Sequence, residues 1–158
     1  MNKLAALIAC ALVAGTAGAA TTCQIGATGL AFGNYDILAS APNDSQANVL
    51  VTCTRDGGPP GITVMMALTE GQYGSSINAR RMANTSMPGE FLAYGLYTDA
   101  GRSKVWGFST GVNTMSSPMS VPNKDSASTT FIIYGRVPAQ QDVAVGSYSD
   151  LVQVTVTP

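Results

Sequence analysis

The chain has 158 residues, of which 46% are hydrophobic and 11% charged, and its formal net charge at pH 7 is −1. So few charges of mixed sign argue against binding to nucleic acid, which needs clustered lysine and arginine. The absence of histidine removes Ser–His and Cys–His catalysis and the commonest metal-binding side chain.

The first predicted element, residues 1–20, is a secretory signal peptide and not part of the fold. Lys3 supplies the positive start, and a short apolar stretch follows that is not long enough to span a bilayer. A run of small residues then suits a signal peptidase, with cleavage after Ala19 or Ala20. We therefore expect one exported domain over residues 21–158, without a transmembrane segment.

The mature domain contains two cysteines, Cys23 and Cys53, because Cys10 leaves with the signal peptide. In an oxidising compartment a single pair of this kind indicates a disulfide. Two buried free thiols are the alternative, and a metal pair would need further ligands that the sequence does not offer. Closing a loop with this spacing should stabilise the fold by roughly 3–4 kcal/mol.

Strand patterns follow one another along the mature chain, separated by turn signals. The first is interrupted by Gly26, Gly29 and Gly33, which indicate bends or bulges. Short strands at this spacing, with no helical stripe of convincing length, predict an all-β sandwich. The expected strands cover residues 23–36, 48–54, 62–68, 91–98, 103–108, 129–137 and the C-terminal stretch within 147–158.

Two polar stretches, residues 70–90 and 110–128, are predicted to be loops. The first contains Arg80 and Arg81, which we interpret as a solvated pair and not as an anion site.

No cofactor or metal site is predicted. Met115 and Met119 are compatible with Cu(I), but filling of the core is the favoured role. Trp106 and Tyr94 could line a ligand surface, and here too the core is favoured. The acidic residues are scattered, so a two-carboxylate glycosidase stays an alternative only because such pairs can meet in the fold. We expect the protein not to be an enzyme.

Several segments together resemble the spore coat protein U domain family, which includes subunits of archaic, Csu-type chaperone–usher pili. The resemblance covers nearly the whole mature chain in the right order. It rests on the segments "FGNYD" after Cys23, Cys53 at the end of a strand, "LAYGLYTDAGRSKVWG", "IIYGRVPAQQDVAVGSYSD" and "VQVTV".

The resemblance implies an immunoglobulin-like β-sandwich that lacks its final strand and is completed by a donor strand from another chain. A periplasmic chaperone would lend this strand first. At an outer-membrane usher, an extension of another pilus subunit would then replace it. The implied function is that of a structural subunit of a surface pilus or a spore-coat-like fibre. The implied route is export through the periplasm to the cell surface.

The C-terminal strand is the candidate edge of that groove. Val152, Val154 and Val156 alternate with polar residues, which indicates a strand with one buried face. No later strand follows in the sequence to cover it. We therefore expect these three valines to face the donor-strand groove.

With cleavage after Ala20, only Thr21 and Thr22 precede Cys23. Two residues cannot span a groove at about 3.3 Å per residue. The chain is thus expected to accept a strand without donating one, as a fibre-end (tip-type) subunit or a coat-type surface protein would. The alternative is a self-contained secreted adhesion or carbohydrate-binding module.

Overall fold

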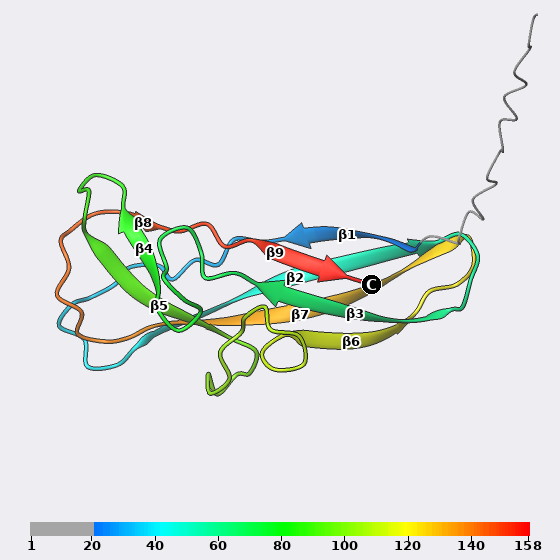
Figure 1. Cartoon of the computed structure of the whole chain (residues 1–158). Helices are drawn as coiled ribbons and strands as arrows, with labels where there is room; N and C mark the ends of the chain where they lie inside the picture. The colour runs from blue at the N-terminus through cyan, green and yellow to red at the C-terminus, as the bar shows by residue number, and fades with distance from the viewer. Residues whose placement is uncertain (1–20) are drawn as a thin grey trace, which may run out of the picture.

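The computed structural model describes residues 21–158 and consists of β-strands joined by turns and loops (Figure 1). The predicted signal peptide, residues 1–20, lies outside the described residues. The strands are β1 (Thr21–Ala27), β2 (Asn43–Arg55), β3 (Gly61–Leu68), β4 (Arg80–Asn84), β5 (Phe91–Tyr97), β6 (Met115–Ser120), β7 (Asp125–Val137), β8 (Tyr148–Ser149) and β9 (Val154–Thr157).

The strands form two sheets. The larger has the order β1-β2-β7-β5-β4-β8, and the smaller has the order β6-β3-β9. In the larger sheet β2 and β7 pair antiparallel along their whole length, from Asn43 opposite Val137 to Arg55 opposite Asp125. Figure 1 shows β3, β6 and β9 alongside this long pair, whereas β4, β5 and β8 lie towards the other end of the molecule. The predicted all-β, immunoglobulin-like sandwich is confirmed.

The two longest strands show why this sequence folds into two layers. In β2, Val49, Val51 and Cys53 are buried, and the residues between them face outward. In β7, Phe131 and Ile133 turn to the same interior. Strict alternation gives each strand one apolar face, and burial of such a side chain is worth roughly 1.5–3 kcal/mol.

Trp106 lies at the centre of the core, with 0% of its surface exposed. Its indole N–H donates to the backbone carbonyl of Met66 in β3 at 3.1 Å. Its backbone N–H donates to the backbone carbonyl of Leu96 in β5 at 2.9 Å. The ring also packs against Phe131, with 6.4 Å between ring centroids. One side chain from a loop therefore joins the two sheets, in agreement with the core role expected for Trp106.

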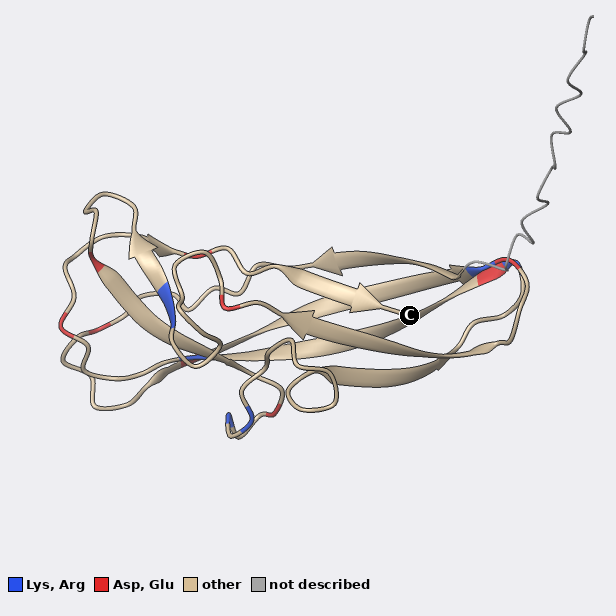
Figure 2. Cartoon of the chain, viewed as in Figure 1, with Lys and Arg blue, Asp and Glu red and all other residues tan. Residues whose placement is uncertain are grey.

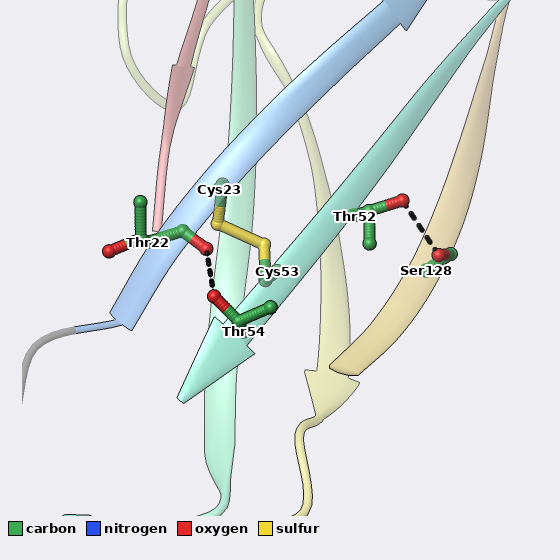
Figure 3. The surroundings of a disulfide bond; sticks show 6 residues. All are labelled: Thr22, Cys23, Thr52, Cys53, Thr54 and Ser128. Carbon is green, nitrogen blue, oxygen red and sulfur yellow. Dashed lines mark hydrogen bonds between the residues drawn. A yellow bond between two sulfur atoms is a disulfide. The ribbon is translucent and has the colours of Figure 1, made fainter. Parts of the chain in front are cut away.

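The structure contains a disulfide between Cys23 in β1 and Cys53 in β2, which stand directly opposite one another in the strand pair. Figure 3 shows it beside a hydrogen bond from the Thr54 hydroxyl to the Thr22 carbonyl, of 3.4 Å. Because β1 pairs with β2 alone among the described strands, this covalent link fastens a strand that has a neighbour on one side only.

Four of the predicted segments were wrong. The two stretches expected to be polar loops contain β4, β6 and the start of β7. Within 103–108, Val105 makes only an isolated bridge to Tyr97. The first strand ends at Ala27 instead of continuing to residue 36. Serine-, proline- and arginine-rich strands lack the apolar alternation on which the predictions depended, so their pairing is decided by neighbours distant in the sequence.

The charged residues are few and lie mostly in loops and near strand ends, as Figure 2 shows. Asp44 in β2 forms ion pairs with Arg136 at 2.7 Å and Arg102 at 3.2 Å. The hydrogen bond from Arg136 lowers the pKa of Asp44 below its ordinary value. These ion pairs attach the loop around Arg102 to the end of the β2–β7 pair.

Replacing both Cys23 and Cys53 with serine should lower the free energy of unfolding by roughly 3–4 kcal/mol, since the unfolded chain regains the entropy of an open loop. Chemical denaturation of the two proteins measures this. Thr54→Ala, beside the disulfide, should change stability by no more than about 0.5 kcal/mol. Mass spectrometry of the non-reduced parent should show that two thiol hydrogens are missing, and free thiols in freshly isolated protein would contradict the pairing.

Candidate functional site

Two strand edges on the same side of the sandwich have no partner among the described residues. β1 pairs only with β2, and β9 pairs only with β3. The two strands are in contact at this side, and Figure 1 shows β9 beside β1. A free edge presents a row of backbone N–H and C=O groups that can pair with another strand.

A groove begins between these edges and contains two neighbouring hollows. The first, of about 490 Å³, lies between the segment that follows β1 and the chain that leads into β9. Its lining is mainly apolar, with side chains from both sheets. They include Leu30, Phe32, Val49, Leu68, Ile133 and Val152.

The second hollow, of about 710 Å³, continues from the first. One wall is the segment 30–37, and the other is the segment 143–148. Leu92 and Val137 also contribute to its lining. The two hollows share Leu30, Phe32, Met82 and Tyr148, so they are parts of one continuous groove.

The three valines predicted to face the groove are all half-buried and packed against the core. Val152 and Val154 line the first hollow, whereas Val156 lies further along β9 and does not line it. Ladder pairing with β3 begins at Val154 opposite Leu68. Just before Val154, the backbone N–H of Thr69 donates to the Gln153 carbonyl, and the backbone N–H of Gln153 donates to the Thr69 hydroxyl oxygen. Both distances are 3.1 Å.

Asp150 holds the chain that enters β9. One of its carboxylate oxygens accepts the Tyr94 hydroxyl at 2.6 Å, and the other accepts the N–H groups of Gln72 at 2.9 Å and Leu151 at 2.9 Å. Gly71 has a positive φ of 86°, and a Cβ atom there would lie 2.0 Å from the carboxylate. The carboxylate thus ties the β3–β4 connection to the groove, and its oxygens are already occupied.

Tyr94 belongs both to the core and to the first hollow. Burial raises the pKa of its hydroxyl far above the ordinary value, and the hydrogen bond from this hydroxyl to Asp150 and the negative charge of Asp150 add to that shift. The hydroxyl therefore stays protonated and can act as a fixed donor to Asp150.

Arg80 overturns the prediction of a solvated arginine pair. It is only 1% exposed, although Arg81 is exposed as expected. Its guanidinium donates to the backbone carbonyls of Thr69 at 2.6 and 2.9 Å and Trp106 at 2.8 Å. Burial lowers the pKa of Arg80 from its ordinary value. An arginine satisfied by backbone carbonyls leaves no local signal in the sequence, since its acceptors come from distant turns.

Two side chains of β2 hold the segment after β1 in place, and the sequence analysis missed both. The Asn43 side-chain amide donates to the carbonyl of Phe32 at 2.9 Å, and the Ser45 hydroxyl donates to that of Ala31 at 2.6 Å. Ladder pairing between β1 and β2 has already ended at Ala27. These side chains therefore keep one wall of the groove beside the sheet without a continuous backbone ladder.

The opposite side of the sandwich is protected. The edge strand there is β6, which carries Pro118 and so lacks one backbone donor. The Ser117 hydroxyl also lies 3.2 Å from the Thr129 hydroxyl of β7, which links the two sheets. Proline is a common device against unwanted strand pairing, and β9 contains none from Val154 to Thr157.

Within residues 21–158, no cluster of three or more acidic or cysteine side chains is placed to hold a metal ion. No helix in that range is long and apolar enough to cross a membrane.

These observations define an immunoglobulin-like β-sandwich with an apolar groove between two free strand edges. The sequence matches the Spore Coat Protein U domain over residues 9–155, and the chain therefore belongs to that family. Among curated proteins it is similar to Protein U of Myxococcus xanthus, with 32% identity over 100 residues. That match spans 60% of this chain and 52% of Protein U.

A solved structure shares the fold. It is the crystal structure of the CsuC–CsuE chaperone–tip adhesion subunit pre-assembly complex from the archaic chaperone–usher Csu pili of Acinetobacter baumannii. The match has a TM-score of 0.54 and 19% identity, and it covers 87% of this chain and 39% of the matched chain. The present chain thus spans well under half of that relative.

The Tyr94 hydroxyl should make stability depend on pH under alkaline conditions. In the unfolded state Tyr94 loses its proton near pH 10, whereas the folded state retains it to higher pH. The free energy of unfolding should therefore be unaffected well below pH 10 and fall as the pH rises above it. In Tyr94→Phe this fall should be shallower by up to about 1.4 kcal/mol per pH unit. Urea denaturation of parent and variant from pH 8 to pH 11 measures the slopes, and parallel slopes would contradict this role.

Proposed function

We propose that the chain is a structural subunit of a chaperone–usher pilus or a spore-coat-like fibre, and that it accepts a β-strand from another chain. The observation that carries this proposal is the apolar groove bordered by the free edges of β1 and β9. Such an edge supplies backbone hydrogen bonds for affinity, and the hollows between the edges receive alternate side chains of the added strand.

The partners follow from this mode of binding. A periplasmic chaperone would fill the groove during export, an outer-membrane usher would be the site of exchange, and another subunit would occupy the groove in the fibre. The family membership and the shared fold with a chaperone–tip adhesion subunit complex support these partners. Val152 and Val154 would then contact the added strand in the first hollow, Val156 would border it further along β9, and the role is structural, not catalytic.

We assign the chain to the end of a fibre. β1 is paired from its first residue, with Thr21 opposite Arg55 and Cys23 bonded to Cys53. With cleavage after Ala19 or Ala20, the chain ahead of the disulfide is already engaged in its own sheet. Thr21 and Thr22 are therefore not available to fill a neighbour's groove.

Val154→Asp should abolish stabilisation by a donor strand, because it places a charge in an apolar hollow. Thr155→Asp is the matched control, since Thr155 is the exposed neighbour on the other face of β9. The probe is a synthetic peptide of about twelve residues in which valine or isoleucine alternates with threonine or lysine. At a peptide concentration about one hundred times Kd, the parent and the control should gain about 2.7 kcal/mol.

Thermal unfolding with and without the peptide measures this gain. A parent that melts at the same temperature in both conditions would contradict strand acceptance and favour a self-contained adhesion module. Equal behaviour of the two aspartate variants would show that the groove does not lie along β9.

The fibre-end assignment has its own test. Placing a donor segment of about twelve residues ahead of Thr21 should produce head-to-tail polymers, because a segment of roughly 40 Å can reach along a neighbour's groove. The unmodified mature protein should remain monomeric by size-exclusion chromatography and on SDS gels without heating. SDS-resistant polymers of the unmodified protein would contradict the assignment.

A further inference from the structure

A proline interrupts the pairing of β5 with β7 beside the second hollow. The register places Gly95 opposite Arg136 and Leu96 opposite Gly135, so its continuation would bring Ala93 opposite Pro138. Pro138 has no N–H to donate, and the ladder cannot continue there. The N–H and C=O groups of Ala93 that face this side of β5 are therefore left without a partner on the β7 backbone.

The side chain of Gln141 supplies that partner. Its Oε1 accepts the Ala93 N–H at 2.8 Å, and its Nε2 donates to the Ala93 carbonyl at 2.9 Å. The same Nε2 lies 3.1 Å from the Pro138 carbonyl. One amide side chain thus takes the place of a strand residue, and it fixes where the chain leaves the sheet to form the 143–148 wall.

Tyr35 joins this arrangement from the other wall. Its hydroxyl donates to the Pro138 carbonyl at 2.8 Å and accepts the backbone N–H of Gln141 at 2.8 Å. Tyr35 also lines the second hollow. A single phenol oxygen therefore connects the segment 30–37 with the segment that follows β7, more than one hundred residues later in the chain.

We propose that Tyr35 and Gln141 are positioning residues that fix the separation between the two walls of the second hollow and so prepare it for an incoming β-strand. This inference rests on the proposed strand-accepting function. Both walls are irregular over most of their length, so without these hydrogen bonds a donor strand would have to order them on binding. Fixing them beforehand lowers that cost, and the benefit appears chiefly as slower dissociation.

The binding test uses conservative variants with matched controls. Tyr35→Phe removes only the hydroxyl, and Gln141→Glu keeps an acceptor for Ala93 but loses the amide donor. Tyr134→Phe and Gln46→Glu make the same chemical changes on β7 and β2, at side chains for which the described part of the chain offers no hydrogen-bond partner and which line neither hollow.

The alternating peptide should dissociate about tenfold faster from Tyr35→Phe and from Gln141→Glu, as expected for loss of one to two hydrogen bonds. The double variant should lose little more than either single variant, because both act in one network. The controls should stay within about twofold of the parent. Dissociation rates equal to that of the parent in both variants would overturn the inference.

A second measurement needs no donor strand. Leu38, which is 83% exposed and follows one wall, and Val145, which is 96% exposed on the other, can be replaced by cysteine and spin-labelled while the Cys23–Cys53 disulfide stays intact. The distance distribution between the labels should broaden in Tyr35→Phe and remain narrow in Tyr134→Phe. An unchanged distribution would overturn the inference. If the parent binds no peptide but the label distance distribution still broadens in Tyr35→Phe, the role of these residues in fixing the walls is supported. Only the proposed strand-accepting function is then overturned.

Discussion

The whole architecture depends on the antiparallel pairing of β2 with β7. These two strands pair along their whole length, and each contributes one apolar face to the core. β1 is attached to the outer side of β2, and β5 joins β7 near its end. β4 and β8 then follow from β5, so the larger sheet is built outward from this pair.

The two edges of the smaller sheet, β6 and β9, differ in how they are protected from pairing with other strands. At β6 a proline and an inter-sheet hydrogen bond protect the edge. At β9 the edge is bare, and half-buried valines border a hollow that the chain's own described residues do not fill. Natural sheets usually blunt both edges. Within one small domain, this difference leaves the β9 edge open to pairing with a further strand and protects the β6 edge from such pairing.

Most of the core strands could be predicted from the sequence, because they depend on local patterns of apolar and polar residues. Apolar and polar residues alternate clearly in the strands that contain Val49 and Val51 or Phe131 and Ile133. The same alternation marks the final strand through Val154 and Val156. The features that shape the groove walls could not be predicted. The buried Arg80, the wall contacts of Asn43 and Ser45, and the Gln141 amide that replaces a strand residue all join a side chain to a backbone group. No period or spacing marks such contacts, because their partners are brought together only by the finished fold.

The scarcity of charge around the groove has a kinetic consequence. Among residues 21–158, the charged side chains that line it are Asp36 and Asp150, and each accepts a backbone N–H. A strand that approaches this groove therefore gains little from long-range attraction, which otherwise raises association rates by about tenfold to a thousandfold. Its encounter should be slow and nearly independent of ionic strength. For the proposed donor strand, fit and backbone pairing in place of charge would therefore make binding nearly the same in fresh water and in brine.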